Sequence, residues 1–158
     1  MIYKIDQSGK AEEVGRDTVL AISNGKSFSI KITARTKVAL RKMFGKSGRG
    51  KVYVYRVFSI LIYLLIVNCG FKVGEVMVDE EYTGQNRLLK DILSWLFIKN
   101  KQKMPEIYFA RIGNKPKVHY AAYNVFRKKI QADLIVSLKE IMNLTTKKDR
   151  GLRRLKNA

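Results

Sequence analysis

The stretch DTVLAISNGKSFSIKIT, residues 17–33, decides how this chain starts to fold. Two runs rich in strand-forming residues, Asp17–Ser23 and Ser27–Thr33, flank Asn24-Gly25, the dipeptide most typical of a two-residue hairpin turn. The alternating segment Met1–Asp6 precedes this hairpin and is joined to it by a polar connection. The pattern therefore predicts three consecutive antiparallel strands.

Downstream of the hairpin the sequence changes from strand-like to helix-like periodicity. Thr36–Phe44 predicts a short basic helix, and Gly45–Lys51 predicts a flexible basic loop. Val52–Cys69 is apolar nearly all round, which is typical of a helix buried on several sides. Its longest apolar run, Val57–Val67, is about half as long as a membrane span requires, so we expect no membrane partner.

Strand and helix patterns alternate in the second half of the chain. The expected elements are a strand over Glu75–Asp79, a helix over Arg87–Ile98, a strand over Glu106–Ile112, a helix from Pro116, a short strand over Leu134–Val136 and a helix from Ser137 to about Leu144. This order predicts a single α/β domain over residues 1–144, with one mixed sheet built from an antiparallel three-stranded meander and strand-helix units. We expect residues 145–158 to form a basic, mobile tail.

The net charge is the most unusual property of the composition. The chain carries 32 Lys and Arg against 13 Asp and Glu, a formal net charge of +19, although its 46% of apolar residues is ordinary for a globular protein. Such self-repulsion costs stability unless a polyanion neutralises it, and nucleic-acid phosphates are the common cellular polyanion. We therefore expect DNA or RNA as a partner. The alternative is a solvated basic surface that serves solubility.

Acidic residues are missing from two long stretches of the chain. None occurs from Thr18 to Gly74, and Glu106 is the only one from Lys99 to Lys129. Tyrosines among these cations offer stacking faces for bases, although aromatic residues of α/β domains more often lie in the core. The candidate nucleic-acid contacts are Lys37, Arg41, Lys42, Lys46, Arg49, Lys51, Arg111, Lys115 and Lys117.

The basic loop at residues 45–51 also fits the phosphate-binding pattern G-x-x-x-x-G-K. Val52 follows it, where such a loop needs Ser or Thr to hold Mg²⁺, and the preceding segment is helix-like rather than a buried strand. We therefore assign the cations of this loop to contacts with backbone phosphates.

Cys69 is the only cysteine of the chain, which leaves no intrachain disulfide and no cysteine-based zinc site. It lies in an apolar run and is expected to be a buried thiol. The N-terminus lacks the basic, apolar and small-residue progression of a signal peptide, so we expect a cytoplasmic protein.

Three adjacent acids, Asp79-Glu80-Glu81, follow the apolar strand predicted at residues 75–79. Ligands of open α/β sheets usually sit at the carboxyl ends of strands, and adjacent carboxylates repel one another unless a cation intervenes. Mg²⁺ or Mn²⁺ is the expected cation, since both prefer carboxylate and water oxygens. In an extended chain Asp79 and Glu81 share one face, so they are the preferred ligand pair. The alternative is a polar strand end that forms helix caps and surface salt bridges.

Other residues extend this candidate site. Asp6 ends the first predicted strand and is either a metal ligand or a turn-initiating aspartate. Asp133, just before the last short strand, is a further candidate ligand. His119 flanks the apolar face of its helix and is either catalytic or a satisfied, partly buried side chain. Together with Arg111 and Lys115 it would lie beside the carboxylates, placed to hold a phosphate.

The order of elements resembles that of the ribonuclease H-like superfamily: three antiparallel strands with an acid on the first, then helix, strand ending in Asp, helix, strand and helix. The resemblance spans roughly residues 1–129 and implies enzymes that hydrolyse phosphodiesters with two carboxylate-held divalent metal ions. It matches Asp6 to the first-strand aspartate and Asp79 to the fourth-strand aspartate, and it offers Asp133 as a late-chain acid. The chain departs from the family because no acid lies on the helices before the fourth strand, and two helices stand there instead of one. Glu81 is the candidate replacement for the missing helical glutamate.

These observations lead to one preferred function and two alternatives. The first alternative is a non-catalytic nucleic-acid or ribonucleoprotein-binding module, and the second is a homo-oligomeric scaffold in which the Val52–Cys69 helix packs against its copy. The preferred function is nucleic-acid binding with metal-dependent phosphodiester hydrolysis. Its candidate catalytic residues are Asp6, Asp79, Glu81 and His119, and its candidate ligands for Mg²⁺ or Mn²⁺ are Asp6, Asp79, Glu81 and Asp133.

Overall fold

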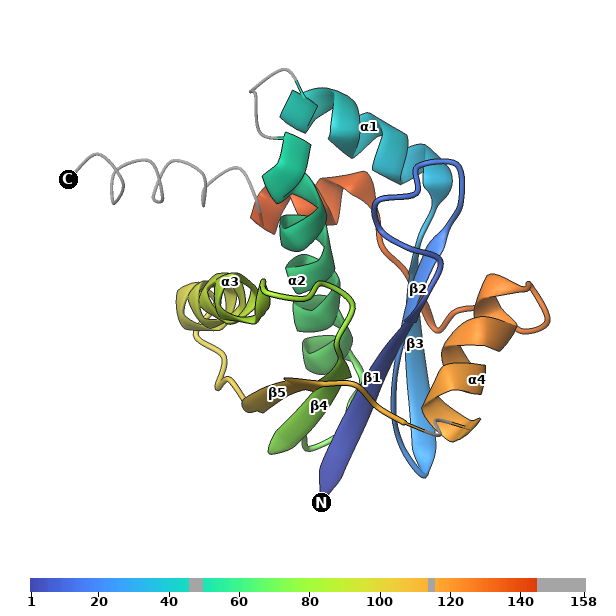
Figure 1. Ribbon diagram of the computed structural model, residues 1–158, viewed down its shortest axis with the longest axis vertical. Coiled ribbons are helices and arrows are strands. Elements are labelled where there is room, and N and C mark those ends of the chain that lie inside the picture. Colours follow the sequence, from blue (N-terminus) through green and yellow to red (C-terminus); the bar gives the residue numbers. More distant parts are fainter. Residues whose placement is uncertain (46–49, 114–115, 145–158) are drawn as a thin grey trace.

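A computed structural model describes residues 1–45, 50–113 and 116–144 (Figure 1). The predicted tail at residues 145–158 lies outside these described residues. The elements are β1 (Ile2–Ser8), β2 (Thr18–Asn24), β3 (Lys26–Ile32), α1 (Ala34–Gly45), α2 (Gly50–Asn68), β4 (Glu75–Asp79), α3 (Asn86–Lys99), β5 (Glu106–Ala110), α4 (Pro116–Phe126), β6 (Leu134–Ile135) and a last helix over residues 138–144.

One mixed sheet of six strands organises the fold, in the order β5-β4-β1-β2-β3-β6. β1, β2 and β3 form the predicted antiparallel meander, and Gly25 turns the β2–β3 hairpin with a φ of +86° that favours glycine. β4 and β5 add in parallel beyond β1, and β6 adds in parallel beyond β3. The prediction of a single α/β domain with a mixed sheet is confirmed.

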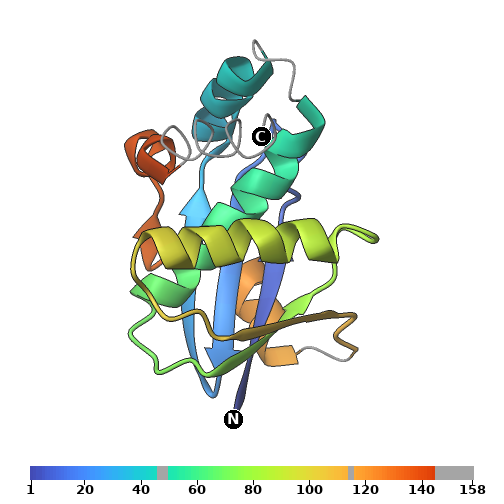
Figure 2. The ribbon, with the colours of Figure 1, turned by 90° about the vertical axis from the view of Figure 1, so that its left-hand side faces the viewer.

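Helices cover both faces of this sheet (Figure 1): α2 and α3 lie on one face, and α4 lies on the other. Figure 2 shows α3 crossing the strands on the face that α2 also covers. The main core lies between these two helices and the sheet, whereas α4 closes a smaller core against β2. The core on the α2 and α3 face is therefore larger than the core on the α4 face. Where α4 covers the sheet, the strands are buried on both faces.

Helix α2 is surrounded by the rest of its own chain. Every residue from 56 to 66 is buried, including the charged Arg56. The hypothesis that the Val52–Cys69 helix packs against a second copy is therefore wrong in its premise, because this helix keeps no continuous apolar face for a partner. Cys69 is buried as expected, and burial raises the pKa of its thiol.

Strand β1 continues beyond the boundary that the sequence predicts. Asp6 pairs with Ala21 inside the ladder, and β1 ends at Ser8. The chain turns only at Gly9, where φ is +75°. The alternative interpretation of Asp6 as the residue that starts the turn is therefore wrong.

Helix α1 begins two residues earlier than the sequence predicts. Asp17 Oδ1 accepts a hydrogen bond from the backbone N–H of Ala34 (2.8 Å), and Thr33 Oγ1 accepts one from the N–H of Thr36 (3.3 Å). Both bonds satisfy N–H groups that have no partner within the helix, which stabilises the first turn.

Lys37 is fully buried, with 0% of its surface exposed. Its Nζ donates to the carbonyl oxygens of Lys10 (3.2 Å) and Glu13 (2.6 Å) and to Oγ1 of Thr18 (2.8 Å). Burial lowers the pKa of Lys37 to about 8, although the negative charge of Asp17 acts to raise it. The assignment of Lys37 to a nucleic-acid contact is therefore wrong: its ammonium group holds the connection between β1 and β2.

Replacing Lys37 by Met should destabilise the protein by about 2–3 kcal/mol at pH 7, because it leaves the acceptors of the Lys37 ammonium group without their donor. The free energy of unfolding is measured by urea denaturation, with the exposed Lys42→Met as the matched control, expected within about 0.5 kcal/mol of wild type.

The same pair of proteins tests the lowered pKa. From pH 8 to about pH 10 the unfolded chain holds the Lys37 proton more tightly than the folded chain, so wild-type stability relative to Lys37→Met should rise by roughly 1–3 kcal/mol. The raised pKa values of Cys69 and the buried tyrosines lower the stability of both proteins as the pH rises. Both proteins keep these residues, so the effect cancels in the difference between their free energies of unfolding. A pH-independent difference would contradict the buried charge.

Candidate functional site

Asp6 and Asp79 lie side by side because β1 and β4 are parallel neighbours. Ile5 is paired with Val78, so the next residue of each strand is an aspartate at the same level of the sheet. Both aspartates are buried, with only 3% and 8% of their surface exposed. The sheet thus brings together two carboxylates from distant parts of the sequence.

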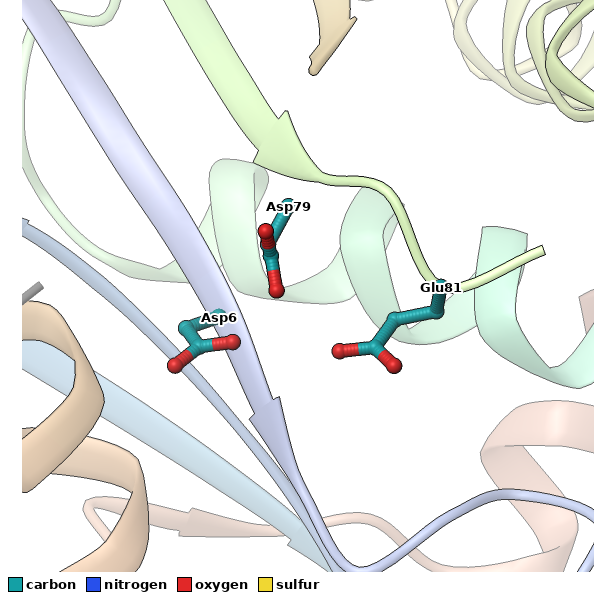
Figure 3. A group of neighbouring side chains, drawn as sticks. All are labelled: Asp6, Asp79 and Glu81. Carbon is teal, nitrogen blue, oxygen red and sulfur yellow. The ribbon is translucent and has the colours of Figure 1, made fainter. Parts of the chain in front are cut away.

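Glu81 completes a group of three carboxylates (Figure 3). It lies two residues beyond the end of β4, and one oxygen from each of Asp6, Asp79 and Glu81 lies within 4.8 Å of the other two. The Glu81 side chain is only partly buried, so the group opens toward solvent on this side. Three of the predicted ligands, Asp6, Asp79 and Glu81, are thus brought together.

The three acids fit a hard divalent cation. Oxygens on opposite sides of one Mg²⁺ are about 4.2 Å apart, since each bond is about 2.1 Å long, and Ca²⁺ allows about 4.8 Å. The observed separations of up to 4.8 Å lie within a small side-chain adjustment of this range. At such distances each charged pair repels by about 3 kcal/mol at an effective dielectric of 20, which a cation would offset.

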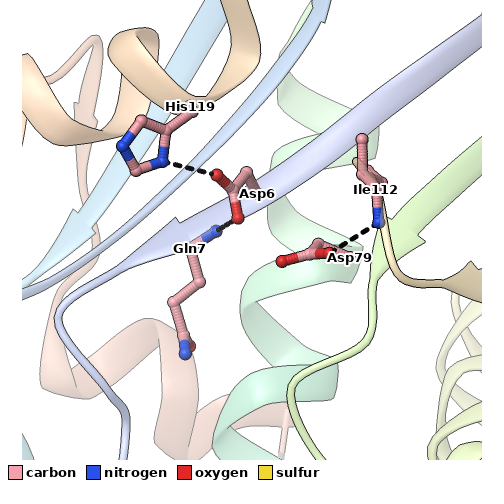
Figure 4. Close-up of polar contacts among 5 residues, drawn as sticks. All are labelled: Asp6, Gln7, Asp79, Ile112 and His119. Carbon is pink, nitrogen blue, oxygen red and sulfur yellow. Dashed lines mark hydrogen bonds and ion pairs between the residues drawn. The ribbon is translucent and has the colours of Figure 1, made fainter. Parts of the chain in front are cut away.

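Backbone N–H groups fix the orientation of both aspartates (Figure 4). The N–H of Gln7 donates to Oδ1 of Asp6 (2.9 Å), and the N–H of Ile112 donates to Oδ1 of Asp79 (3.0 Å). β5 ends at Ala110 and not at Ile112 because Ala110 lies opposite Asp79, the last residue of β4. Both carboxylates are thus positioned before any ligand binds.

His119 approaches the group from α4, on the opposite side of Asp6 from Asp79 (Figure 4). Its Nδ1 lies 3.1 Å from Oδ2 of Asp6, and 46% of its side chain is exposed. The imidazole stacks on Tyr123, with ring centroids 5.7 Å apart and an interplanar angle of 14°, and Tyr120 contacts it edge-on. The ring is therefore held in place while one side remains open to solvent.

Asp133 does not belong to this group. Its Oδ2 accepts hydrogen bonds from the backbone N–H (2.8 Å) and the hydroxyl (3.3 Å) of Ser29. It precedes β6 at one edge of the sheet, whereas β2 and β3 separate that edge from β1. The assignment of Asp133 as a metal ligand is therefore wrong, because its carboxylate joins β6 to β3.

Apart from the buried Lys37, the candidate nucleic-acid contacts lie in several parts of the chain. Arg41 and Lys42 are exposed on α1, whereas Arg111 and Lys117 are exposed on either side of the connection from β5 to α4. Lys51 falls in the first turn of α2. Lys46, Arg49 and Lys115 lie outside the described residues.

Two features of the site escaped the sequence. The N–H of Ile112 carries no signal in residue identity, because every residue except proline offers that donor. Arg127 lies over the ring of Tyr123, with Cζ 6.0 Å from its centroid, and extends the contact between His119 and Tyr123. The spacing of four residues between each of these side chains was the available signal, since it places them along one side of a helix.

No helix among the described residues has the length and apolar character needed to cross a membrane. Comparisons with known protein families, curated proteins and solved structures give no match to this chain.

Metal binding at the three acids should raise the melting temperature. A divalent cation at 100 times its dissociation constant adds about 2.7 kcal/mol, which corresponds to several degrees. Asp79→Asn should abolish the rise produced by Mg²⁺ or Mn²⁺, and it should raise the melting temperature of the metal-free protein because one repulsive charge is removed.

The exposed Asp91→Asn on α3 is the control, since it removes the same charge outside the group and should keep the full rise. Differential scanning fluorimetry measures all three proteins with and without metal. An equal rise in all three would show that the cation acts elsewhere.

Proposed function

We propose that this protein binds nucleic acid and hydrolyses phosphodiester bonds with divalent metal ions held by Asp6, Asp79 and Glu81. The observation that carries the proposal is the convergence of these three carboxylates within 4.8 Å at the carboxyl ends of adjacent parallel strands. This position is where open α/β sheets usually bind their ligands.

The resemblance to the ribonuclease H-like superfamily supports the proposal in two respects. It implies that the first-strand and fourth-strand aspartates act together, and the pairing of β1 with β4 sets Asp6 beside Asp79. It also leaves a ligand to be found, because no acid lies on α1 or α2. Glu81 supplies a third carboxylate to the group of Asp6 and Asp79, which supports its role as the replacement ligand.

The charge distribution favours a phosphodiester as the substrate. The chain carries a net charge of +19, yet three acids gather at one point, with Arg111, Lys117 and His119 on the connections and helix beside it. Phosphates are attracted to the cations, and a divalent cation is attracted to the acids. Carboxylates at this point would repel a phosphate unless a cation lies between them.

Divalent cations in such a site supply an activated water and stabilise the charge on the leaving oxygen. The protein's own groups have separate tasks. Asp6 and Asp79 hold their carboxylates in fixed orientations through the N–H groups of Gln7 and Ile112. His119 holds the second oxygen of Asp6 from the side opposite Asp79, and 46% of its side chain is exposed to solvent.

A non-catalytic nucleic-acid-binding module is the second candidate function. The observation that favours it is the position of Asp133, which leaves only three acids in the group found among the described residues. The two candidates differ in cleavage and agree in binding.

The test measures binding and cleavage on the same labelled single-stranded and double-stranded DNA and RNA. Wild type should bind all or some of these with a steep salt dependence and cut at least one of them in Mg²⁺ or Mn²⁺. Asp79→Asn should lower the cleavage rate by at least about 100-fold and leave affinity in EDTA equal to that of wild type or higher, because it removes one negative charge.

Asp91→Asn again serves as the matched control and should cut like wild type. Binding without cleavage in either metal would support the passive module and overturn the hydrolase. Absence of binding at low salt would overturn both, because the basic surface would then have no polyanion partner.

A further inference from the structure

A groove of about 440 Å³ lies at the C-terminal end of α4, away from the three acids, and shares Arg127 with the site described above. The connection from β1 to β2 forms one wall, and the end of α4 forms the other. Its lining residues are Gly15, Arg16, Asp17, Phe126, Arg127 and Lys128. All three cations are exposed, whereas the one acid, Asp17, already accepts a hydrogen bond from the N–H of Ala34.

The groove has a fixed shape. The ammonium group of Lys37 holds the β1–β2 connection through hydrogen bonds to the carbonyl oxygens of Lys10 and Glu13. Gly9 packs so closely against α4 that a Cβ there would lie 2.6 Å from the ring of Phe126 and 2.2 Å from the carbonyl oxygen of Asp17. Its φ of +75° also favours glycine. The wall that carries Arg16 is thus anchored to the sheet and to α4.

A line of side chains along α4 connects the acids to the groove. His119 contacts Asp6, Tyr123 stacks on His119, and Arg127 lies over Tyr123. These residues are four apart, so they follow one side of the helix over about 12 Å. This is about the axial rise of three to four base pairs of a duplex.

Lys128 has an unusual backbone for a lysine. Its φ is +61°, and it occupies the left-handed position that ends α4, where its N–H donates to Val125 and the next N–H donates to Asn124. Glycine is the usual residue there because a Cβ is strained in this conformation. A lysine therefore costs some stability at this position.

We propose that the groove between Arg16, Arg127 and Lys128 binds a backbone phosphate of a nucleic-acid strand that runs along α4 from the three acids. The inference rests on the proposed function, since it takes the same polyanion as its ligand. It adds the direction in which the strand leaves the acids and the residues that hold it.

Affinity for a labelled 20-nucleotide strand, single or paired, is measured by fluorescence anisotropy in EDTA across a series of salt concentrations. Arg127→Gln and Lys128→Gly should each weaken binding about fivefold or more and reduce the slope of log affinity against log salt by about one. Lys139→Gln is the matched control, because it removes one exposed cation from the last helix, which packs on the α2 side of the sheet, and should change affinity less than twofold.

Lys128→Gly separates a binding role from a structural one. Relief of the strained backbone should raise the melting temperature by about 2 °C while affinity falls. A structural lysine would change both in the same direction or leave affinity unchanged. In a cleavage assay Arg127→Gln should raise KM and leave kcat within about twofold, because the groove is distant from the reacting phosphate.

The outcomes distinguish this inference from the proposed function. If wild type binds or cuts nucleic acid and both groove variants match Lys139→Gln, the groove assignment is overturned and the hydrolase stands. If wild type binds no nucleic acid, the proposed function fails first and the groove assignment fails with it. Loss of affinity in both groove variants, with Asp79→Asn binding normally, supports the groove.

Discussion

The parallel pairing of β1 with β4 is the constraint on which the site depends. It aligns Ile5 with Val78. The aspartates that follow these two residues therefore lie side by side. Two like charges in a buried position cost free energy, and the surrounding structure offsets part of it with the N–H groups of Gln7 and Ile112. The pairing is maintained because Ile5 and Val78 themselves lie in the core under α2, so the apolar core supplies the free energy that holds the acids at this distance.

Acidic and basic side chains of this protein gather in different places. Three acids gather at the sheet in a chain with a large positive excess, so the charge at this point is opposite in sign to the net charge of the protein. Helix α4 connects the acidic group to the cationic groove. His119 contacts Asp6 near one end of the helix, and Arg127 lines the groove at the other end. The nucleic-acid strand that we propose as the substrate would contact both ends of α4.

Lys37 shows that the number of cations in the sequence overstates the basic surface. It follows Arg35 in a helix that otherwise exposes its cations, yet its ammonium group is buried and bound to main-chain carbonyl groups. Its role is to hold the connection between β1 and β2, the same connection that forms one wall of the groove beside α4. The buried ammonium group of Lys37 thus helps to position the exposed Arg16 in the wall of the groove.

Local sequence rules determined much of this protein. The Asn-Gly turn specified the hairpin of β2 and β3, the continuous apolar run specified the burial of α2, and alternation along the extended chain placed Asp79 and Glu81 on one face. Each of these follows from residues a few positions apart. The tertiary structure alone decided that β4 pairs with β1, that Lys37 turns inward and that Asp133 bonds to Ser29 instead of joining the acids. The physical reason is that strand pairing and burial depend on packing free energy summed over residues far apart in the chain, which no local pattern contains.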